Sequence, residues 1–171
     1  MINVGINGFG RIGKCTFLQL LLNPNFNIKC INALEFEAKD IEDYLLYDTT
    51  HKHHIPINVE VIDEHNIRIN RHTIVLFSDI DATKLQWKQY NCNYIIDATG
   101  AYLSQEKCSL HNCDYIVISS PPKDNTPTFI YGVNQDKYNG EKIVSGSSCT
   151  TNAISPLLKL LNDNSNIISC I

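Results

Sequence analysis

The sequence lacks the features that mark most nucleic-acid-binding and membrane proteins. Its 14 Lys and Arg residues are outnumbered by 18 Asp and Glu residues, the net charge is -4, and the basic residues are scattered. No segment therefore offers the basic surface that nucleic acid binds. The longest apolar stretches, such as residues 17–22, are far shorter than the roughly 20 residues of a membrane span. We expect neither a nucleic-acid partner nor a membrane partner.

Export and metal-binding patterns are missing as well. The N-terminus has no charged segment followed by an apolar one, so we expect the cytoplasm. The seven cysteines are odd in number and irregularly spaced, which argues against a disulfide framework. Cys108 and Cys113 form no CxxC pair, so no metal site is predicted. We interpret the crowded His51, His53 and His54 as solvated loop side chains rather than metal ligands.

What is present is an alternation of strand-like and helix-like segments over 171 residues, the length of about one domain. The patterns predict strands at residues 2–6, 28–32, 94–100, 115–120, 129–133 and 142–145, short strands within 55–77 with turns at 63–64 and 70–71, and a strand opening at 167–171. They predict helices over 12–22, 38–46, 83–88 and 104–111, and one capped by Thr150 or Thr151 that runs to about residue 161.

The stretch NGFGRIG at residues 7–13 places Gly8, Gly10 and Gly13 in the spacing GxGxxG between a predicted strand and a predicted helix. In that context the first glycine permits a tight turn, the second lets backbone approach a pyrophosphate, and the third lets the helix pack on the sheet. A plain glycine-rich turn is the alternative, but the context favours dinucleotide binding. We therefore expect an α/β fold of the Rossmann type, with a doubly wound, mainly parallel sheet.

The second predicted strand departs from the dinucleotide-binding pattern at its end. An acidic residue usually stands there and accepts hydrogen bonds from the adenosine ribose, whereas this chain has Asn32 and Ala33. Glu35 and Glu37 follow, beyond the strand end, where their carboxylates are expected to point elsewhere. Loss of the carboxylate weakens NAD binding and removes the charge that repels a 2′-phosphate. The expected cofactor is NAD, and NADP stays possible because of Ala33.

The stretch SGSSCTTN at residues 145–152 places Cys149 just before a helical run. A helix N-terminus stabilises a thiolate, so this cysteine is a candidate nucleophile. A small packed residue is the alternative when the cysteine is considered alone.

Several motifs occur in the order and spacing of one known family, and the chain resembles phosphorylating glyceraldehyde-3-phosphate dehydrogenases over essentially its whole length. The SCTTN segment is specific to that family and to the related erythrose-4-phosphate dehydrogenases. The matching motifs are VGINGFGRIG at 4–13, YDTTH at 47–51, DATG at 97–100, ISSPPKD at 118–124, YGVNQDKY at 131–138 and SGSSCTTN at 145–152.

The resemblance implies oxidation of an aldehyde, glyceraldehyde 3-phosphate, with Cys149 as the catalytic residue. The cysteine would attack the aldehyde, hydride would pass from the thiohemiacetal to the nicotinamide, and phosphate would release the acyl group from the thioester. Matching positions also acquire roles from the family. These are Arg11 and Ile12 with the three glycines at the pyrophosphate turn, Thr99 and Ser119 beside the cofactor, and Ser148 and Thr150 at the substrate.

The chain also departs from the family it resembles. Ala33 stands at the ribose-binding aspartate, Ile80 stands where a basic residue is common, and Gly146 and Ala153 alter the cysteine motif. The resemblance further implies a base histidine well beyond the nucleophile, and no such residue follows in these 171 residues. We expect a dinucleotide-binding domain at 1–150 and, at 151–171, a helix and the first strand of a catalytic domain that is otherwise largely absent.

Three functional hypotheses stay open at this point. The first is a glyceraldehyde-3-phosphate dehydrogenase-like chain whose isolated turnover is negligible without the base. The second is an erythrose-4-phosphate dehydrogenase-like chain. The third is a non-catalytic dinucleotide-binding or interaction protein. The expected partners are a small-molecule substrate and either a complementing C-terminal half or further copies of the chain.

Overall fold

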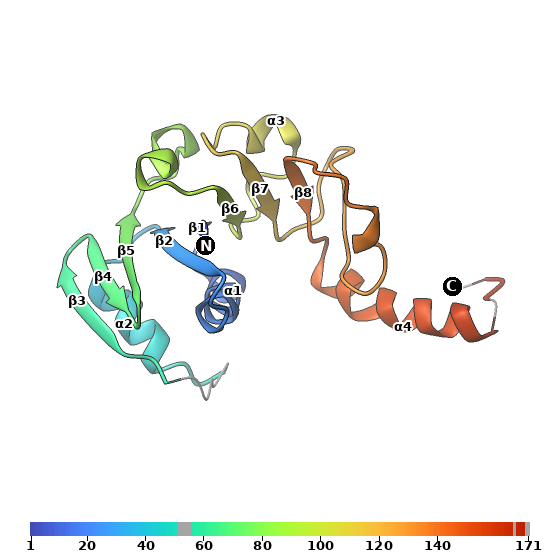
Figure 1. Ribbon diagram of the computed structural model, residues 1–171, viewed down its shortest axis with the longest axis horizontal. Coiled ribbons are helices and arrows are strands. Elements are labelled where there is room, and N and C mark those ends of the chain that lie inside the picture. Colours follow the sequence, from blue (N-terminus) through green and yellow to red (C-terminus); the bar gives the residue numbers. More distant parts are fainter. Residues whose placement is uncertain (51–55, 166, 170–171) are drawn as a thin grey trace.

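The computed structural model describes residues 1–50, 56–165 and 167–169, and its strands form an eight-stranded sheet in the order β3-β4-β5-β2-β1-β6-β7-β8 (Figure 1). The predicted histidine cluster at 51–54 lies outside these residues. The strands are β1 Ile2–Asn7, β2 Phe26–Asn32, β3 Val59–Asp63, β4 Asn66–Ile69, β5 His72–Phe77, β6 Tyr94–Asp97, β7 Tyr115–Ile118 and β8 Ile143–Ser145.

The sheet is mainly parallel. From β5 through β2, β1, β6 and β7 to β8, every neighbouring pair runs parallel, whereas β3 and β4 form an antiparallel edge. The chain order reverses between β1 and β6, which makes that position the topological switch point. The expectation of a doubly wound, mainly parallel α/β sheet is confirmed.

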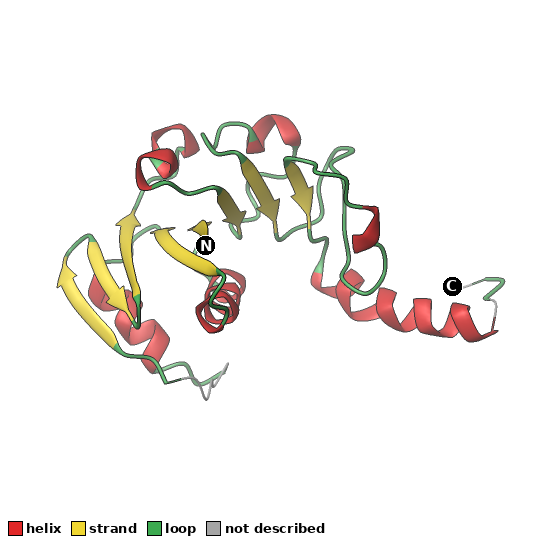
Figure 2. Ribbon diagram, viewed as in Figure 1, coloured by secondary structure: helices red, strands yellow, loops and turns green. Residues whose placement is uncertain are grey.

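Helices flank the sheet on both faces (Figure 2). The α-helices are α1 Arg11–Leu22, α2 Ala38–Leu46, α3 Gln105–Cys108 and α4 Cys149–Ser165, and the 3-10 turns are η1 Ala82–Lys84, η2 Trp87–Tyr90 and η3 Gln135–Lys137. On one face Phe17 and Leu21 of α1 pack with Ile41 and Leu45 of α2 in a single core. A second core on the other face gathers around the buried Trp87. Each fully buried large apolar side chain contributes about 1.5–3 kcal/mol.

Most of the predictions about local elements are confirmed. Residues 55–77 contain three short strands, β3 to β5, and the turns between them fall next to Asp63 and at Asn70, whose φ of 51° suits a tight turn. The strands predicted at 2–6, 28–32, 94–100, 115–120 and 142–145, and the helices predicted at 12–22 and 38–46, are also present with small shifts at their ends.

Other predicted elements are wrong. Residues 129–133 form no strand because Gly132, with φ of 82°, turns the chain, and Val133 N–H donates to the carbonyl of Ile130. The helix predicted at 83–88 is replaced by η1 and η2, since the backbone is extended at Leu85. The helix predicted at 104–111 ends at Cys108, where the chain enters a turn closed by His111 N–H.

The C-terminal helix begins earlier and ends later than predicted. Ser148, rather than Thr150 or Thr151, caps α4, because its Oγ accepts from the N–H of Thr151 at 3.1 Å. The helix contains Pro156 and continues to Ser165. Residues 167–169 form no strand, and 170–171 lie outside the described residues. The proposed domain boundary after residue 150 falls inside α4.

Candidate functional site

The glycine turn joins β1 to α1 at the switch point. Gly8 has φ of 91°, and a Cβ there would lie 2.9 Å from the Thr99 side chain. A Cβ on Gly13 would overlap the carbonyl oxygen of Gly8, so helix and turn pack too closely for any side chain. Gly10 is the N-cap of α1, contributes no side-chain cap, and has no atom within 4 Å of an added Cβ. The first-turn N–H groups of α1 therefore remain available to an anion.

Two clefts open beside this turn. The first has a volume of about 590 Å³ and the second about 540 Å³. The first is lined by residues of the turn and of the loops after β2, β5 and β6, namely Asn7, Gly8, Phe9, Gly10, Asn32, Ala33, Leu34, Phe36, Tyr44, Asp79, Ile80, Ala98, Thr99, Ala101 and Tyr102. The second is lined by Ile12, Thr16, Ile96, Val117, Ile118, Ser119, Ser120, Pro121, Gly146, Ser147, Ser148, Cys149 and Asn152.

The structure brings most of the predicted site residues to these clefts. Gly13 lies beneath the turn, and Arg11 and Thr150 are exposed beside the clefts without lining either. Of the remaining predicted residues, Gly8, Gly10 and Thr99 line the first cleft, and Ile12, Ser119, Ser148 and Cys149 line the second.

The first cleft has one ionisable carboxylate near the end of β2. Among the described lining residues Asp79 is the only one with a formally charged side chain. Glu37 caps α2 in a reciprocal arrangement with Asp40, and Glu35 and Glu37 line a separate, smaller hollow. Neither glutamate lines the first cleft, as expected from their place beyond the strand end.

Cys149 stands exposed at the first residue of α4 and lines the second cleft. Beside it the Ser148 hydroxyl lies 3.0 Å from Thr150 Oγ1 and 2.7 Å from Thr151 Oγ1. Ser119, at the end of β7, lines the same cleft. The nucleophile candidate thus shares its cleft with the hydroxyl groups of Ser119 and Ser148, which can bind oxygens of a substrate.

Hydrogen bonds fix the loop that carries the cysteine. Ser145 Oγ donates to the carbonyl of Ser120 at 2.7 Å and accepts from Ser147 N–H at 2.9 Å. Ser147 has φ of 66°, and the Asn152 side chain donates to the carbonyl of Gly146 at 2.6 Å. An added Cβ on Gly146 meets only ordinary contact at 3.7 Å, so the glycine there is not required by the backbone.

No second ionisable side chain is found among the described residues that line the second cleft. A thiol reaction there needs a group that accepts and returns protons. Within the described part of the chain this cleft therefore supplies a nucleophile and hydroxyl groups but no base.

The buried cysteines differ from Cys149. Burial, with the nearby charges of Asp97 and Asp124, raises the pKa of Cys108 to about 11. Burial also raises the pKa of Cys113. The Cys30 and Cys92 sulfurs lie 3.9 Å apart, and the contact raises the pKa of Cys30 above its usual value. Among the described residues no cluster of three His, Cys, Asp or Glu side chains suits a metal ion.

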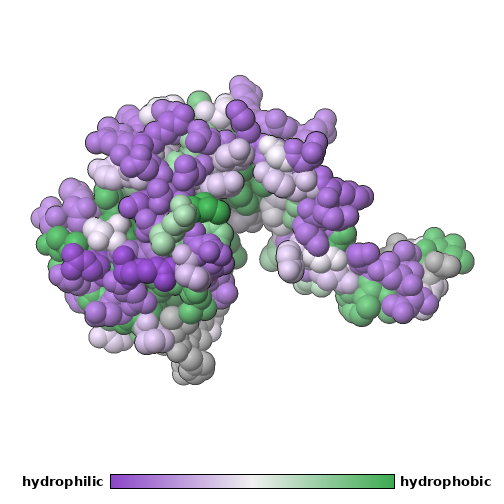
Figure 3. All heavy atoms as spheres, in the orientation of Figure 1, coloured by the Kyte–Doolittle hydropathy of each residue, from purple (hydrophilic) through white to green (hydrophobic). Residues whose placement is uncertain are grey.

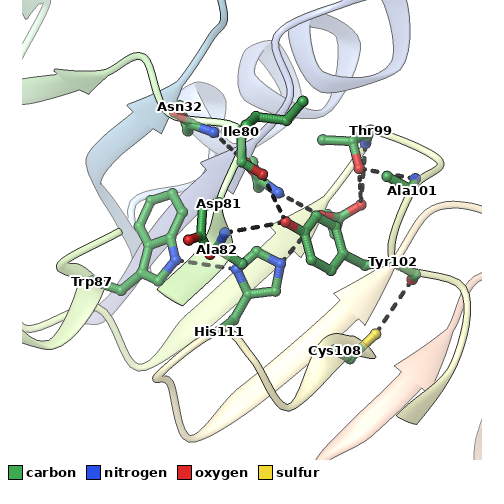
Figure 4. A network of polar contacts seen from close by, with 12 residues as sticks. Asn32, Ile80, Asp81, Ala82, Trp87, Thr99, Ala101, Tyr102, Cys108 and His111 are labelled. Atoms are coloured by element: carbon green, nitrogen blue, oxygen red, sulfur yellow. Dashed lines mark hydrogen bonds and ion pairs between the residues drawn. The ribbon is translucent and has the colours of Figure 1, made fainter. Parts of the chain in front are cut away.

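A buried polar network lies under the first cleft and was not predicted from the sequence. Asn7, Asp97 and His111 are each no more than 2% exposed, and Asn32 joins them at 5%. Asn7 and Asp97 lie inside motifs that were recognised, NGFGRIG and DATG, but no pattern in the sequence brings His111 next to them. Figure 4 shows His111 between Trp87 and Tyr102, below Thr99.

A parallel sheet with a GxGxxG turn at its switch point, opening onto two clefts, defines a dinucleotide-binding α/β domain of the Rossmann type. Residues 2–105 match the family model described as glyceraldehyde 3-phosphate dehydrogenase, NAD binding domain. The chain therefore belongs to the glyceraldehyde 3-phosphate dehydrogenase family, a family of NAD-dependent oxidoreductases, and carries its NAD-binding domain.

Curated relatives match nearly the whole chain. It is 41% identical over 170 residues to the glyceraldehyde-3-phosphate dehydrogenase of Salmonella typhimurium and to glyceraldehyde-3-phosphate dehydrogenase A of Escherichia coli K12, covering 98% of this chain and 50% of each relative. It is 37% identical to the cytosolic glyceraldehyde-3-phosphate dehydrogenase of Leishmania mexicana, covering 98% of this chain and 51% of that relative. The chain thus spans about half the length of these relatives. No helix among the described residues is long and apolar enough to cross a membrane.

Proposed function

We propose that the chain is the cofactor-binding and thiol-bearing part of an NAD-dependent dehydrogenase that oxidises glyceraldehyde 3-phosphate. The observation that carries this proposal is that Ile12, from the glycine turn, and Cys149, from the start of α4, line one cleft. A cofactor whose pyrophosphate lies on the N-terminus of α1 extends from there toward the thiol. The names of the relatives supply the substrate.

The described residues fit a dinucleotide. Gly10 leaves open space at the helix N-terminus for the pyrophosphate, and the first cleft, beside Ala33 and Thr99, suits the adenosine. Ser119 and Ile12 would border the nicotinamide in the second cleft. When bound, NAD supplies the hydride acceptor of the reaction.

The side chains at the start of α4 then have distinct roles. The Cys149 thiolate would attack the aldehyde carbon and form a thiohemiacetal. Its carbon would give a hydride to bound NAD and its hydroxyl would lose a proton to a base, which leaves a thioester. Inorganic phosphate displaces the thiolate and leaves as the acyl phosphate, so aldehyde, phosphate and NAD give acyl phosphate, NADH and a proton. The Ser148 and Thr150 hydroxyls, 3.0 Å apart, would bind oxygens of the substrate or of the attacking phosphate.

A second candidate function is dinucleotide binding without turnover by this chain alone. It is favoured by the second cleft, where Cys149 has no ionisable neighbour among the described lining residues. General acid–base assistance contributes roughly 10²–10⁴-fold to such reactions. We propose that the base comes from a polypeptide that corresponds to the rest of the relatives' length. Erythrose 4-phosphate is the alternative substrate. The KD pair at 123–124 slightly favours glyceraldehyde 3-phosphate over it.

For the cofactor we propose NAD in preference to NADP. Ala33 provides no ribose-binding carboxylate, but it also provides no cation for a 2′-phosphate, and the charged side chain in the described lining is the acidic Asp79. A 2′-phosphate would therefore enter a cleft of its own sign. We also propose the cytoplasm as the compartment, in keeping with the name of the Leishmania relative.

Calorimetric titration of the purified chain with NAD and with NADP tests this proposal. We expect saturable NAD binding that is tighter than NADP binding, and about tenfold tighter NAD binding after Ala33→Asp, which restores the ribose carboxylate. Cys149→Ser serves as the control, since it removes the thiol and leaves the adenosine cleft intact. Absence of binding to either dinucleotide would contradict the proposal.

A further inference from the structure

A chain of polar side chains crosses the carboxyl ends of three strands beneath the first cleft. Asn32 of β2 donates from Nδ2 to Asn7 Oδ1 on β1 at 2.7 Å, and Asn7 donates from Nδ2 to Asp97 Oδ2 on β6 at 2.6 Å. Asn32 also exchanges two hydrogen bonds with the backbone of Asp79. Since a carboxylate only accepts hydrogen bonds, the orientation of each amide along the chain is determined.

Asp97 connects this chain to the wall of the cleft. Its Oδ1 accepts from the Thr99 N–H at 3.1 Å and from Thr99 Oγ1 at 2.8 Å, while Oδ2 accepts from Asn7. Both Thr99 and Asn7 line the first cleft. The orientation of the Asp97 carboxylate therefore determines the orientation of the Thr99 and Asn7 side chains in the cleft.

His111 lies behind that carboxylate, at the end of the loop after α3. The indole N–H of Trp87 donates to His111 Nδ1 at 3.3 Å, and because an indole N–H has no acceptor capacity, Nδ1 must carry a lone pair. The proton of the neutral ring is then on Nε2, which lies 3.4 Å from Asp97 Oδ2. This contact is electrostatic, because Nε2 makes no hydrogen bond among the described residues. Figure 4 shows the Trp87 side chain beside the His111 ring.

The imidazole also supports a second side of the cleft. The Tyr102 ring lies 4.5 Å from the His111 ring, centroid to centroid. The Tyr102 hydroxyl donates to the carbonyl of Ile80 at 3.0 Å and accepts from Ala82 N–H at 3.2 Å. Tyr102 and Ile80 both line the first cleft. The His111 ring therefore contacts Tyr102 directly and Ile80 through the Tyr102 hydroxyl.

We propose that His111, in its Nε2–H form, is a positioning residue for dinucleotide binding that orients the Asp97 carboxylate and through it Thr99 and Asn7. This inference rests on the proposed function, because it concerns the affinity of the first cleft for the dinucleotide. A buried N–H dipole acts strongly on a carboxylate in a medium of low polarity. Without it Asp97 Oδ2 loses this electrostatic contact and is held by the hydrogen bond from Asn7 alone, while Oδ1 keeps its bonds from Thr99, so the carboxylate is held less firmly.

The test compares two buried histidines in the full chain. His111→Leu removes the ring nitrogens beneath the cleft, and we expect about tenfold weaker NAD binding by calorimetry. His111→Gln returns a donor near the Nε2 position and is expected to recover most of the affinity. The matched control is His72→Leu. His72 is equally buried on β5, but it makes no hydrogen bond to Asn32, Asn7 or Asp97 and lines neither cleft.

Two readouts separate positioning from a merely structural role. Thermal unfolding is expected to show loss of stability in both leucine variants, whereas NAD affinity is expected to fall only for the His111 variant. Long-range ¹⁵N–¹H spectra of the unmodified chain are expected to show the His111 proton on Nε2. A proton on Nδ1, or unchanged affinity in His111→Leu, would overturn the inference. If the unmodified chain binds no dinucleotide, the proposed function fails first and this inference fails with it.

Discussion

At the scale of single residues, exposure and surroundings distinguish Cys149 from the other described cysteines. Cys149 is exposed at a helix N-terminus, where the helix dipole stabilises an anion. Burial raises the pKa of Cys108 and Cys113, which keeps both as unreactive thiols. We expect iodoacetamide to label Cys149 at least about tenfold faster than the buried cysteines, as followed by peptide mass spectrometry over time. Cys149→Ser should abolish the fast phase, and equal rates at all sites would contradict the prediction.

His72 makes stability depend on pH. Its buried Nδ1 accepts from Ile28 N–H at 3.1 Å, and burial, with the charges of Arg71 and Lys29, lowers its pKa to about 4. The ordinary pKa of His in the unfolded chain is about 6.5, so between these values the unfolded chain binds the proton and the folded chain does not. Stability contributed by neutral His72 is therefore complete above about pH 6.5 and is lost as the pH falls toward 4.

The measurement is urea unfolding at pH 7 and pH 5. In His72→Asn an amide oxygen replaces Nδ1 as acceptor and does not titrate, so the loss of stability between the two pH values should shrink by on the order of 1–2 kcal/mol. His65, which is exposed in the turn before β4, offers a control, since His65→Asn should leave the pH dependence unchanged. A loss as large in His72→Asn as in the unmodified chain would show that other groups cause it.

Residues within a motif could be predicted from the sequence, whereas residues gathered by the fold could not. Gly13 and Cys149 follow from local spacing, because a turn and a helix start are properties of a few consecutive residues. His111 is 14 positions from Asp97 in the chain, and its place depends on the loops after η2 and α3, where strand and helix patterns are weak. The burial of a polar side chain such as His111 cannot be predicted from its sequence neighbours, because its partners come from other parts of the chain.

At the scale of elements, two glycines of the β1–α1 turn have different roles: Gly13 is required for packing of α1, whereas Gly10 leaves room for a ligand. Gly13→Ala places a methyl group on the Gly8 carbonyl and forces α1 away from β1, so we expect a loss of about 3 kcal/mol in unfolding free energy. Gly10→Ala meets no atom within 4 Å and has ordinary extended backbone, so stability should be nearly unchanged. NAD affinity should nevertheless fall, because the methyl group occupies the approach to the helix N-terminus.

Denaturant unfolding and NAD titration of both glycine variants check this pair of outcomes. A stable Gly13→Ala protein would show that helix and turn can separate without cost. A Gly10→Ala protein with full affinity would show that the pyrophosphate does not approach the backbone at that residue.

The elements that could be predicted are those with strong periodicity and clear ends. The buried parallel strands and α1 have long apolar patterns, whereas residues 129–133 have a β-type composition interrupted by Gly132, and a local turn forms instead. The third helix shows the same competition, since turn bonds at His111 end it after one turn. Tertiary contacts decide such short segments, and propensity alone does not.

At the scale of the whole molecule, α4 extends away from the sheet (Figure 1), and its visible surface mixes apolar and polar side chains (Figure 3). None of its residues is buried, and its large apolar side chains Ile154, Leu157, Leu160 and Leu161 are 47%, 52%, 61% and 47% exposed. Most helices in proteins owe their stability to packing of an apolar face rather than to helix propensity. We therefore expect an apolar surface to cover α4, and the half of the relatives' length that this chain does not span is the candidate.

Mixing the chain with the C-terminal half of a relative tests whether that half covers α4 and whether it supplies the base for Cys149. We expect the purified chain alone to show negligible NADH formation from glyceraldehyde 3-phosphate and NAD, and a mixture with the C-terminal half of the Escherichia coli relative to show activity and a heterodimer by analytical ultracentrifugation. Leu157→Glu with Leu161→Glu should abolish both, while NAD binding by the chain persists, because these positions line neither cleft. A heterodimer without activity would mean that α4 docks but the base does not reach Cys149. Activity of the isolated chain would show that the proton acceptor lies within these 171 residues, which the composition of the second cleft argues against.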